Sequence, residues 1–118
     1  MQYLVTRGDL GRHEFGAGSF ATLFHGGQHG LPTISLMLGE VQPGEGAALH
    51  RHPYEELFVL HEGQARYIIA GVTVEAGVGD LVLVPAHAPH SFINTGAGVL
   101  RQTGVHAADK VTIEWLDG

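Results

Sequence analysis

The stretch from Gly44 to Gly63, GEGAALHRHPYEELFVLHEG, decides how this sequence folds. A His-Arg-His segment at 50–52 is followed by a proline and then by Glu56. Side chains alternate between the two faces of an extended chain, so the two histidines share one face. Proline cannot donate to a strand ladder and ends the first strand, and Glu56 begins the next. The stretch therefore predicts two strands that carry imidazole and carboxylate groups on one side.

A second stretch, GDLVLVPAHAPHSFIN from Gly79 to Asn94, brings another histidine of the same parity, His90. If both stretches line one barrel, the side chains of His50, His52, Glu56 and His90 converge on its interior. Three imidazoles and a carboxylate can hold one divalent transition metal per chain and leave positions open for chemistry. Fe, Mn, Ni, Zn, Cu and Co all accept such donors, and the donor set does not choose among them.

The rest of the chain is typical of an all-β protein. Short apolar runs between glycine and proline turns predict antiparallel strands, and no segment shows a sustained helical period. Residues 107–111 have room for one helical turn at most. The predicted strands cover residues 34–41, 57–61, 64–70, 72–74, 81–84, 90–93, 99–105 and 111–115.

Composition limits the classes of protein that this chain can belong to. Its 118 residues support a single domain, 1–118, and the absence of cysteine excludes disulfides and thiol nucleophiles. The net charge of −6 and only six scattered Lys and Arg residues argue against a nucleic-acid partner. The start of the chain does not resemble a signal peptide, and the apolar runs are too short to span a membrane. A cytoplasmic protein is expected.

The two stretches resemble the two motifs of the cupins. The first motif, Gly-x5-His-x-His-x3-Glu-x6-Gly, is matched without a gap over residues 44–63. The second, Gly-x5-Pro-x-Gly-x2-His-x3-Asn, is matched over 79–94 except that His87 stands in place of its internal glycine. The resemblance implies a single-domain cupin with a jelly-roll antiparallel β-barrel, in which His50, His52, Glu56 and His90 bind the metal. It also implies a homodimer.

His87 and Glu56 are the candidates for catalytic roles. The glycine of the motif tolerates a positive φ, and histidine is among the other residues that adopt one more readily. His87 is therefore either a loop residue at the rim of the barrel or a proton shuttle near the metal. Glu56 could leave the metal and act as a general base.

Three further residues are candidates for contact with a substrate. Phe58 and Phe92 share the interior parity and are expected to floor the cavity, with plain core packing as the alternative. His106 follows the predicted strand 99–105 and could reach the mouth of the pocket. The histidines at 13, 25 and 29 are expected in loops, and the segment 114–116 is expected to be a closing strand at a subunit contact.

The site as a whole predicts a metal-binding cupin that acts as an enzyme on a small oxygenated substrate. A dioxygenase is favoured over an isomerase, lyase or cyclase, because open positions on a redox-active metal can serve both dioxygen and a chelating substrate. The alternative is a non-catalytic module that binds or senses a small ligand. Cupins carry out many reactions, so the family does not name the substrate.

Overall fold

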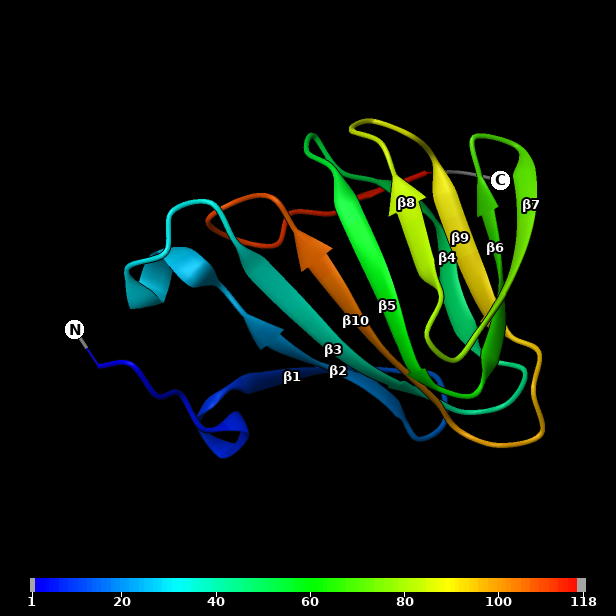
Figure 1. Ribbon diagram of the computed structural model, residues 1–118, viewed down its shortest axis with the longest axis horizontal. Helices are drawn as coiled ribbons and strands as arrows, with labels where there is room; N and C mark the ends of the chain where they lie inside the picture. The colour runs from blue at the N-terminus through cyan, green and yellow to red at the C-terminus, as the bar shows by residue number, and fades with distance from the viewer. Residues whose placement is uncertain (1, 117–118) are drawn as a thin grey trace.

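The computed structural model describes residues 2–116, which form short β-strands and two 3₁₀ turns (Figure 1). None of the described helices is long and apolar enough to cross a membrane. The elements, in chain order, are η1 (Arg7–Asp9), β1 (Gly11–Phe15), β2 (Ser19–Phe24), η2 (Gly26–His29), β3 (Ser35–Val41), β4 (Gly46–Arg51), β5 (Glu56–Glu62), β6 (Gln64–Ile69), β7 (Val72–Gly77), β8 (Leu81–Val84), β9 (His90–Asn94), β10 (Leu100–His106) and β11 (Glu114–Trp115).

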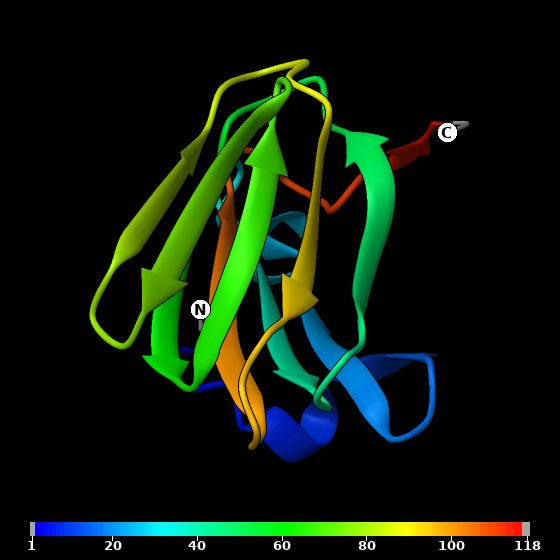
Figure 2. The ribbon, with the colours of Figure 1, turned by 90° about the vertical axis from the view of Figure 1, so that its right-hand side faces the viewer.

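The strands form two sheets that face each other (Figure 2). Sheet A has the order β1-β2-β3-β10-β5-β8, and sheet B has the order β11-β4-β9-β6-β7, with antiparallel pairing throughout. The first and the last strand each occupy a sheet edge, so both ends of the chain contribute to the barrel. This arrangement confirms the predicted all-β jelly roll.

The core lies between the sheets and follows the alternation of each strand. On β5, Glu56, Phe58 and Leu60 are buried, whereas Leu57 and Val59 between them face outward and are only half-buried. The opposing sheet contributes buried residues of β6 and β7, among them Tyr67. An alternating pattern of this kind is what a strand with one buried face requires.

The N-terminal region differs from the sequence prediction. Residues 11–15 and 19–24, for which no strand was predicted, form β1 and β2 at the edge of sheet A. Their glycine-rich surroundings hide the strand signal, and the pairing of β2 with β3 and of β1 with β2 stabilises the extended conformation. At the other end β11 covers only residues 114–115 of the predicted strand 111–115, and β10 extends one residue further than expected, to His106.

The motif glycines occupy turns that need a left-handed backbone. Gly63 has a φ of 88°, and a Cβ at this position would lie 2.7 Å from the carbonyl oxygen of Val99. Glycine alone therefore fits the tight turn between β5 and β6. His87, which replaces the glycine of the second motif, also has a positive φ of 66°. The backbone at 87 thus keeps the conformation for which the motif uses glycine.

Candidate metal centre

Four side chains from three strands and a loop meet between the sheets. His50 is the next-to-last residue of β4, Glu56 begins β5 and His90 begins β9, while His52 lies just beyond β4. Antiparallel register sets His50 directly opposite His90. All four side chains are buried, and each offers one donor atom within 4.8 Å of the others. They form a metal site that suits one divalent ion per chain, as the sequence predicts.

Each of the three imidazoles is oriented by a backbone carbonyl group. A neutral imidazole has one N–H, so donation from Nδ1 leaves the lone pair of Nε2 for a metal. The Nδ1–carbonyl pairs are His50 with Ala48 at 2.7 Å, His90 with Ala88 at 2.9 Å and His52 with Thr112 at 2.7 Å.

The carboxylate of Glu56 lies among these Nε2 atoms. Its Oε1 is 3.0 Å from Nε2 of His52 and 3.2 Å from Nε2 of His90. With Nδ1 as the donor on each neutral ring, these contacts join two acceptors, an arrangement that becomes favourable when a proton or a metal ion lies between them. The donor set therefore fits a metal ion.

The protonation states also suit a metal. Burial, together with smaller effects of the neighbouring His90 and His52, lowers the pKa of His50 to about 4. Burial alone would raise the pKa of the Glu56 carboxyl, but its contacts with His106, His52 and His90 outweigh that effect and hold the pKa well below its usual range. Near neutral pH both groups are in the deprotonated form that binds metal.

His106 contacts the second carboxylate oxygen of Glu56, Oε2. It is fully buried, and its Nε2 lies 3.0 Å from Oε2 of Glu56. Its Nδ1 is 2.6 Å from the Tyr54 hydroxyl, which also receives the backbone N–H of Thr112 at 3.0 Å. Burial raises the pKa of Tyr54 to about 12, so the hydroxyl keeps its proton, for which Nδ1 of His106 and the Thr112 carbonyl oxygen at 3.3 Å are the acceptors. When the hydroxyl donates to Nδ1 of His106, the proton of that ring is on Nε2, which lies 3.0 Å from Oε2 of Glu56.

Gly104 provides the space for this carboxylate. It lies on β10 two residues before His106, and a Cβ at 104 would overlap Oε2 of Glu56. The same Cβ would lie 3.4 Å from Nε2 of His106. The glycine is thus required by the close approach of a side chain rather than by its backbone angles.

The metal group opens on one side into a cavity of about 280 Å³. His50, His52 and Glu56 form one part of the wall, and Gln102 is a polar group elsewhere in it. Among the described residues that line the cavity there is no lysine or arginine, and His13 is the one titratable side chain outside the metal group. The remaining wall is mainly apolar and includes Phe15, Met37, Phe58, Phe92, Ile113 and Trp115.

The other residues that the sequence suggested for catalysis or substrate contact fall into two groups, those that line the cavity and those that do not. Phe58 and Phe92 both line the cavity, and their rings pack edge to face with centroids 5.9 Å apart. His106 lies behind Glu56 and does not line the cavity. His87 lies on the exposed loop between β8 and β9, where its backbone N–H donates to the carbonyl of His52 at 2.8 Å.

Several residues that line the cavity were not predicted from the sequence. His13 and Phe15 lie on β1, in a region where no strand was predicted, and the ring of Trp115 on β11 packs at a tilt against His50 with centroids 5.1 Å apart. Gln102 is buried on β10 with the parity of Gly104 and His106. Strand alternation predicts that Gln102 faces the barrel interior, but a single glutamine in a strand does not by itself indicate a function.

Comparison with known proteins identifies the family. The family model described as a cupin domain matches residues 37–105, more than half of the chain. This protein therefore belongs to the cupin family. No functionally curated protein matches the sequence.

Solved structures with the same fold include oxalate decarboxylases. The formate complex of the Lactobacillus farciminis enzyme has a TM-score of 0.81 at 28% identity, covering 92% of this chain and 34% of that one. A structure of the Bacillus subtilis enzyme, from work on its Mn(II) centres, has a TM-score of 0.78 at 24% identity and covers 86% of this chain and 29% of that one. This chain thus spans about a third of these enzymes, and the second likeness concerns the fold alone.

Proposed function

We propose that this protein is a metal-dependent enzyme that binds the oxygen atoms of a small substrate to the metal and holds the body of that substrate in the apolar cavity. The observation that carries the proposal is the position of the metal group. Three of its four members border the cavity, and the other walls are largely apolar. A substrate with two adjacent oxygens, such as a catechol, an enolised diketone or an α-hydroxyketone, fits a metal with open positions.

A dioxygenase reaction is the best supported of the possible reaction classes. Isomerases and lyases that move protons need a general base near the substrate. Among the described cavity residues His13 is the one titratable group outside the metal set, and the low pKa of Glu56 makes its carboxylate a weak base. A redox-active metal, when bound, supplies open positions at which dioxygen and a chelating substrate can react.

The residues of the chain then have distinct tasks. The three backbone carbonyls orient the imidazoles, and His106 and Tyr54 hold the Glu56 carboxylate in place. Phe58 and Phe92 exclude water from the substrate, which strengthens electrostatic interactions inside the cavity. His87 has no part in this scheme beyond its position in the loop.

Oxygen uptake with a defined metal tests the proposal. Chelator-treated protein is reloaded separately with Fe(II), Mn(II), Ni(II), Cu(II), Co(II) or Zn(II), and each form is mixed with a catechol, a β-diketone and an α-hydroxyketone. We expect oxygen consumption matched by a cleaved product for at least one redox-active metal, and none for His52→Ala. His61→Ala is the matched control, because His61 lies outward on β5. Binding without turnover would instead support the ligand-binding alternative, and an isomerised or decarboxylated product formed without oxygen would contradict the dioxygenase assignment.

We also propose a homodimer that forms through the outer face of sheet A. Antiparallel register places Leu57 beside Leu83 and Val59 beside Leu81 on this face. Leu81 and Leu83 are 59% and 69% exposed. Adjacent apolar side chains on a sheet face are typical of a surface that a partner covers.

Light scattering with size-exclusion chromatography tests the dimer. The wild-type chain should have the mass of two copies, and Leu83→Glu should have the mass of one. Val72→Glu is the control, because Val72 is 62% exposed on the edge strand of sheet B. A monomeric wild-type chain would refute the proposal.

A further inference from the structure

A buried amide group faces the cavity at a distance from the metal group. Gln102 lies on β10 two residues before Gly104, whose Cα faces the Glu56 carboxylate. Two residues advance a strand by about 7 Å, so Gln102 lies one inward position further along the barrel. Its side chain is 5% exposed and borders the cavity. A polar group is costly in such apolar surroundings unless it has a partner.

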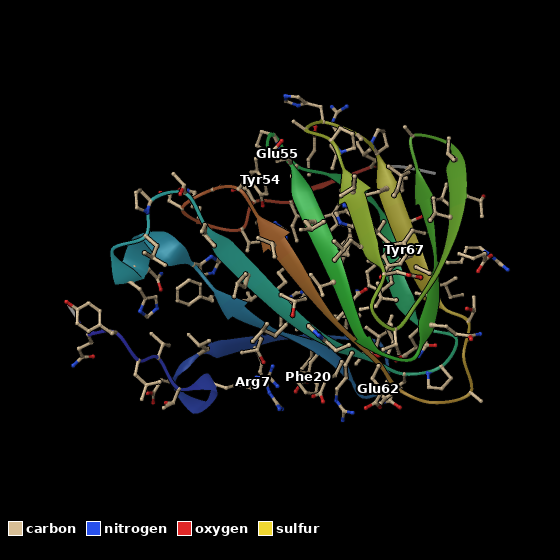
Figure 3. The ribbon with its side chains drawn as sticks, viewed as in Figure 1. Arg7, Phe20, Tyr54, Glu55, Glu62 and Tyr67 are labelled. Carbon is tan, nitrogen blue, oxygen red and sulfur yellow. The ribbon has the colours of Figure 1, made fainter. Side chains whose placement is uncertain are left out.

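The Tyr67 hydroxyl satisfies one half of this amide. It donates a hydrogen bond to Oε1 of Gln102, which links β6 of sheet B to β10 of sheet A. Burial raises the pKa of Tyr67 well above its usual range, so the hydroxyl stays a donor. The Tyr67 ring is held by Phe58 and Phe92, with centroids 5.1 and 5.7 Å away. Figure 3 shows Tyr67 among the strands, well away from Tyr54 in the loop before β5.

The other half of the amide remains available. Nε2 of Gln102 has no hydrogen-bond partner among residues 2–116. Gly39 on the neighbouring β3 leaves the space beside it open, since even a Cβ at 39 would be 4.0 Å from Nε2. Because Tyr67 occupies Oε1, the NH₂ group is presented to whatever fills the cavity. It can only donate hydrogen bonds.

We propose that Gln102 anchors the substrate by donating a hydrogen bond to a neutral oxygen, such as a ketone, ester or hydroxyl oxygen, and that Tyr67 positions the amide for this contact. The acceptor is neutral because no lysine or arginine lines the described cavity, and a carboxylate there would be an unpaired buried charge. The inference rests on the proposed function and refines its substrate. The substrate carries metal-binding oxygens at one end, an apolar body, and an oxygen acceptor beyond it.

Two matched catechols test the anchor on the intact Zn(II)-loaded protein, in which zinc prevents redox turnover. One carries a ketone on its side chain, one carbon away from the ring, and the other has a methylene group in place of the carbonyl. Calorimetry gives the ratio of their dissociation constants for each variant. We expect the ratio of dissociation constants to favour the ketone about fivefold to tenfold more in the wild-type protein than in Gln102→Leu. This factor corresponds to the net free energy of one hydrogen bond.

Three further variants separate anchoring from folding. Tyr67→Phe should give an intermediate ratio, because the amide is then free to rotate. Tyr67→Phe/Gln102→Leu removes both partners of the buried hydrogen bond, so it should fold and show no ketone preference. Gln64→Leu, a change to an exposed glutamine on β6, should retain the wild-type ratio.

The outcomes distinguish this proposal from the proposed function. If wild type and Gln102→Leu bind both catechols with the same ratio, the anchor is refuted while chelation at the metal stands. If the metal-loaded wild-type protein binds neither catechol, the chelating substrate class is wrong and the anchor is overturned with it.

Discussion

The substitution Gly104→Ala tests the geometry of the metal group most directly. A methyl group at 104 would overlap Oε2 of Glu56, while Cδ of the same carboxyl would be at an ordinary contact distance of 3.5 Å. The carboxylate must rotate or withdraw by about 1 Å to restore normal contact. This movement breaks its contact with His106 and misplaces a metal ligand. Disturbing the groups that hold a ligand typically weakens metal binding about 10- to 100-fold, or about 1.4 to 2.8 kcal/mol.

Competition with a chromogenic chelator measures the metal affinity of the variant. The fold should persist by circular dichroism, although overpacking should cost about 1–3 kcal/mol in the free energy of unfolding. Gly77→Ala is the matched control, because a Cβ at 77 meets no atom within 4 Å. It should leave the metal affinity unchanged. Equal metal affinities for folded Gly104→Ala and the wild-type protein would show that the position of the carboxylate does not govern binding.

The remaining predictions concern the histidines. In metal-free protein the folded pKa of His50 is about 4 against the usual 6.5, so its contribution to stability is complete above pH 6.5 and is lost as the pH falls towards 4. The loss in the free energy of unfolding is about 3 kcal/mol. Urea unfolding at several pH values should show this loss in the wild-type protein and a smaller one in His50→Asn. Equal losses in the two proteins would contradict the low pKa of His50. By elemental analysis His90→Ala should lose most of its metal and His87→Ala should keep it, and metal loss from folded His87→Ala would mean that the ligand set is drawn wrongly. His106→Asn should keep a metal site of about tenfold lower affinity because Glu56 loses a partner, and an unchanged affinity would show that His106 only fills space.

The family and the metal group could be predicted from the sequence because their determinants are local. His50, His52 and Glu56 lie within seven residues of one another, and strand alternation alone places the two histidines on one face. The turn glycines are just as local, since a positive φ restricts the residue type wherever it occurs. Even the exception at His87 could be interpreted, and the structure gives it the positive φ that the motif implies.

The chemistry of the cavity was decided by the tertiary structure. Its wall collects residues from strands far apart in the chain, such as His13 on β1, Gln102 on β10 and Trp115 on β11. The Tyr67–Gln102 hydrogen bond joins two sheets across 35 positions of sequence.

The same holds for the position of His106. Its neighbour Glu56 is fixed by the register between β10 and β5. A sequence pattern reports which face of a strand a residue occupies, but strand pairing selects what it meets there. Three of the metal ligands were therefore evident from spacing and His90 from the family resemblance, whereas the proposed substrate donor Gln102 and the contact of His106 with Glu56 depend on long-range pairing that periodicity does not encode.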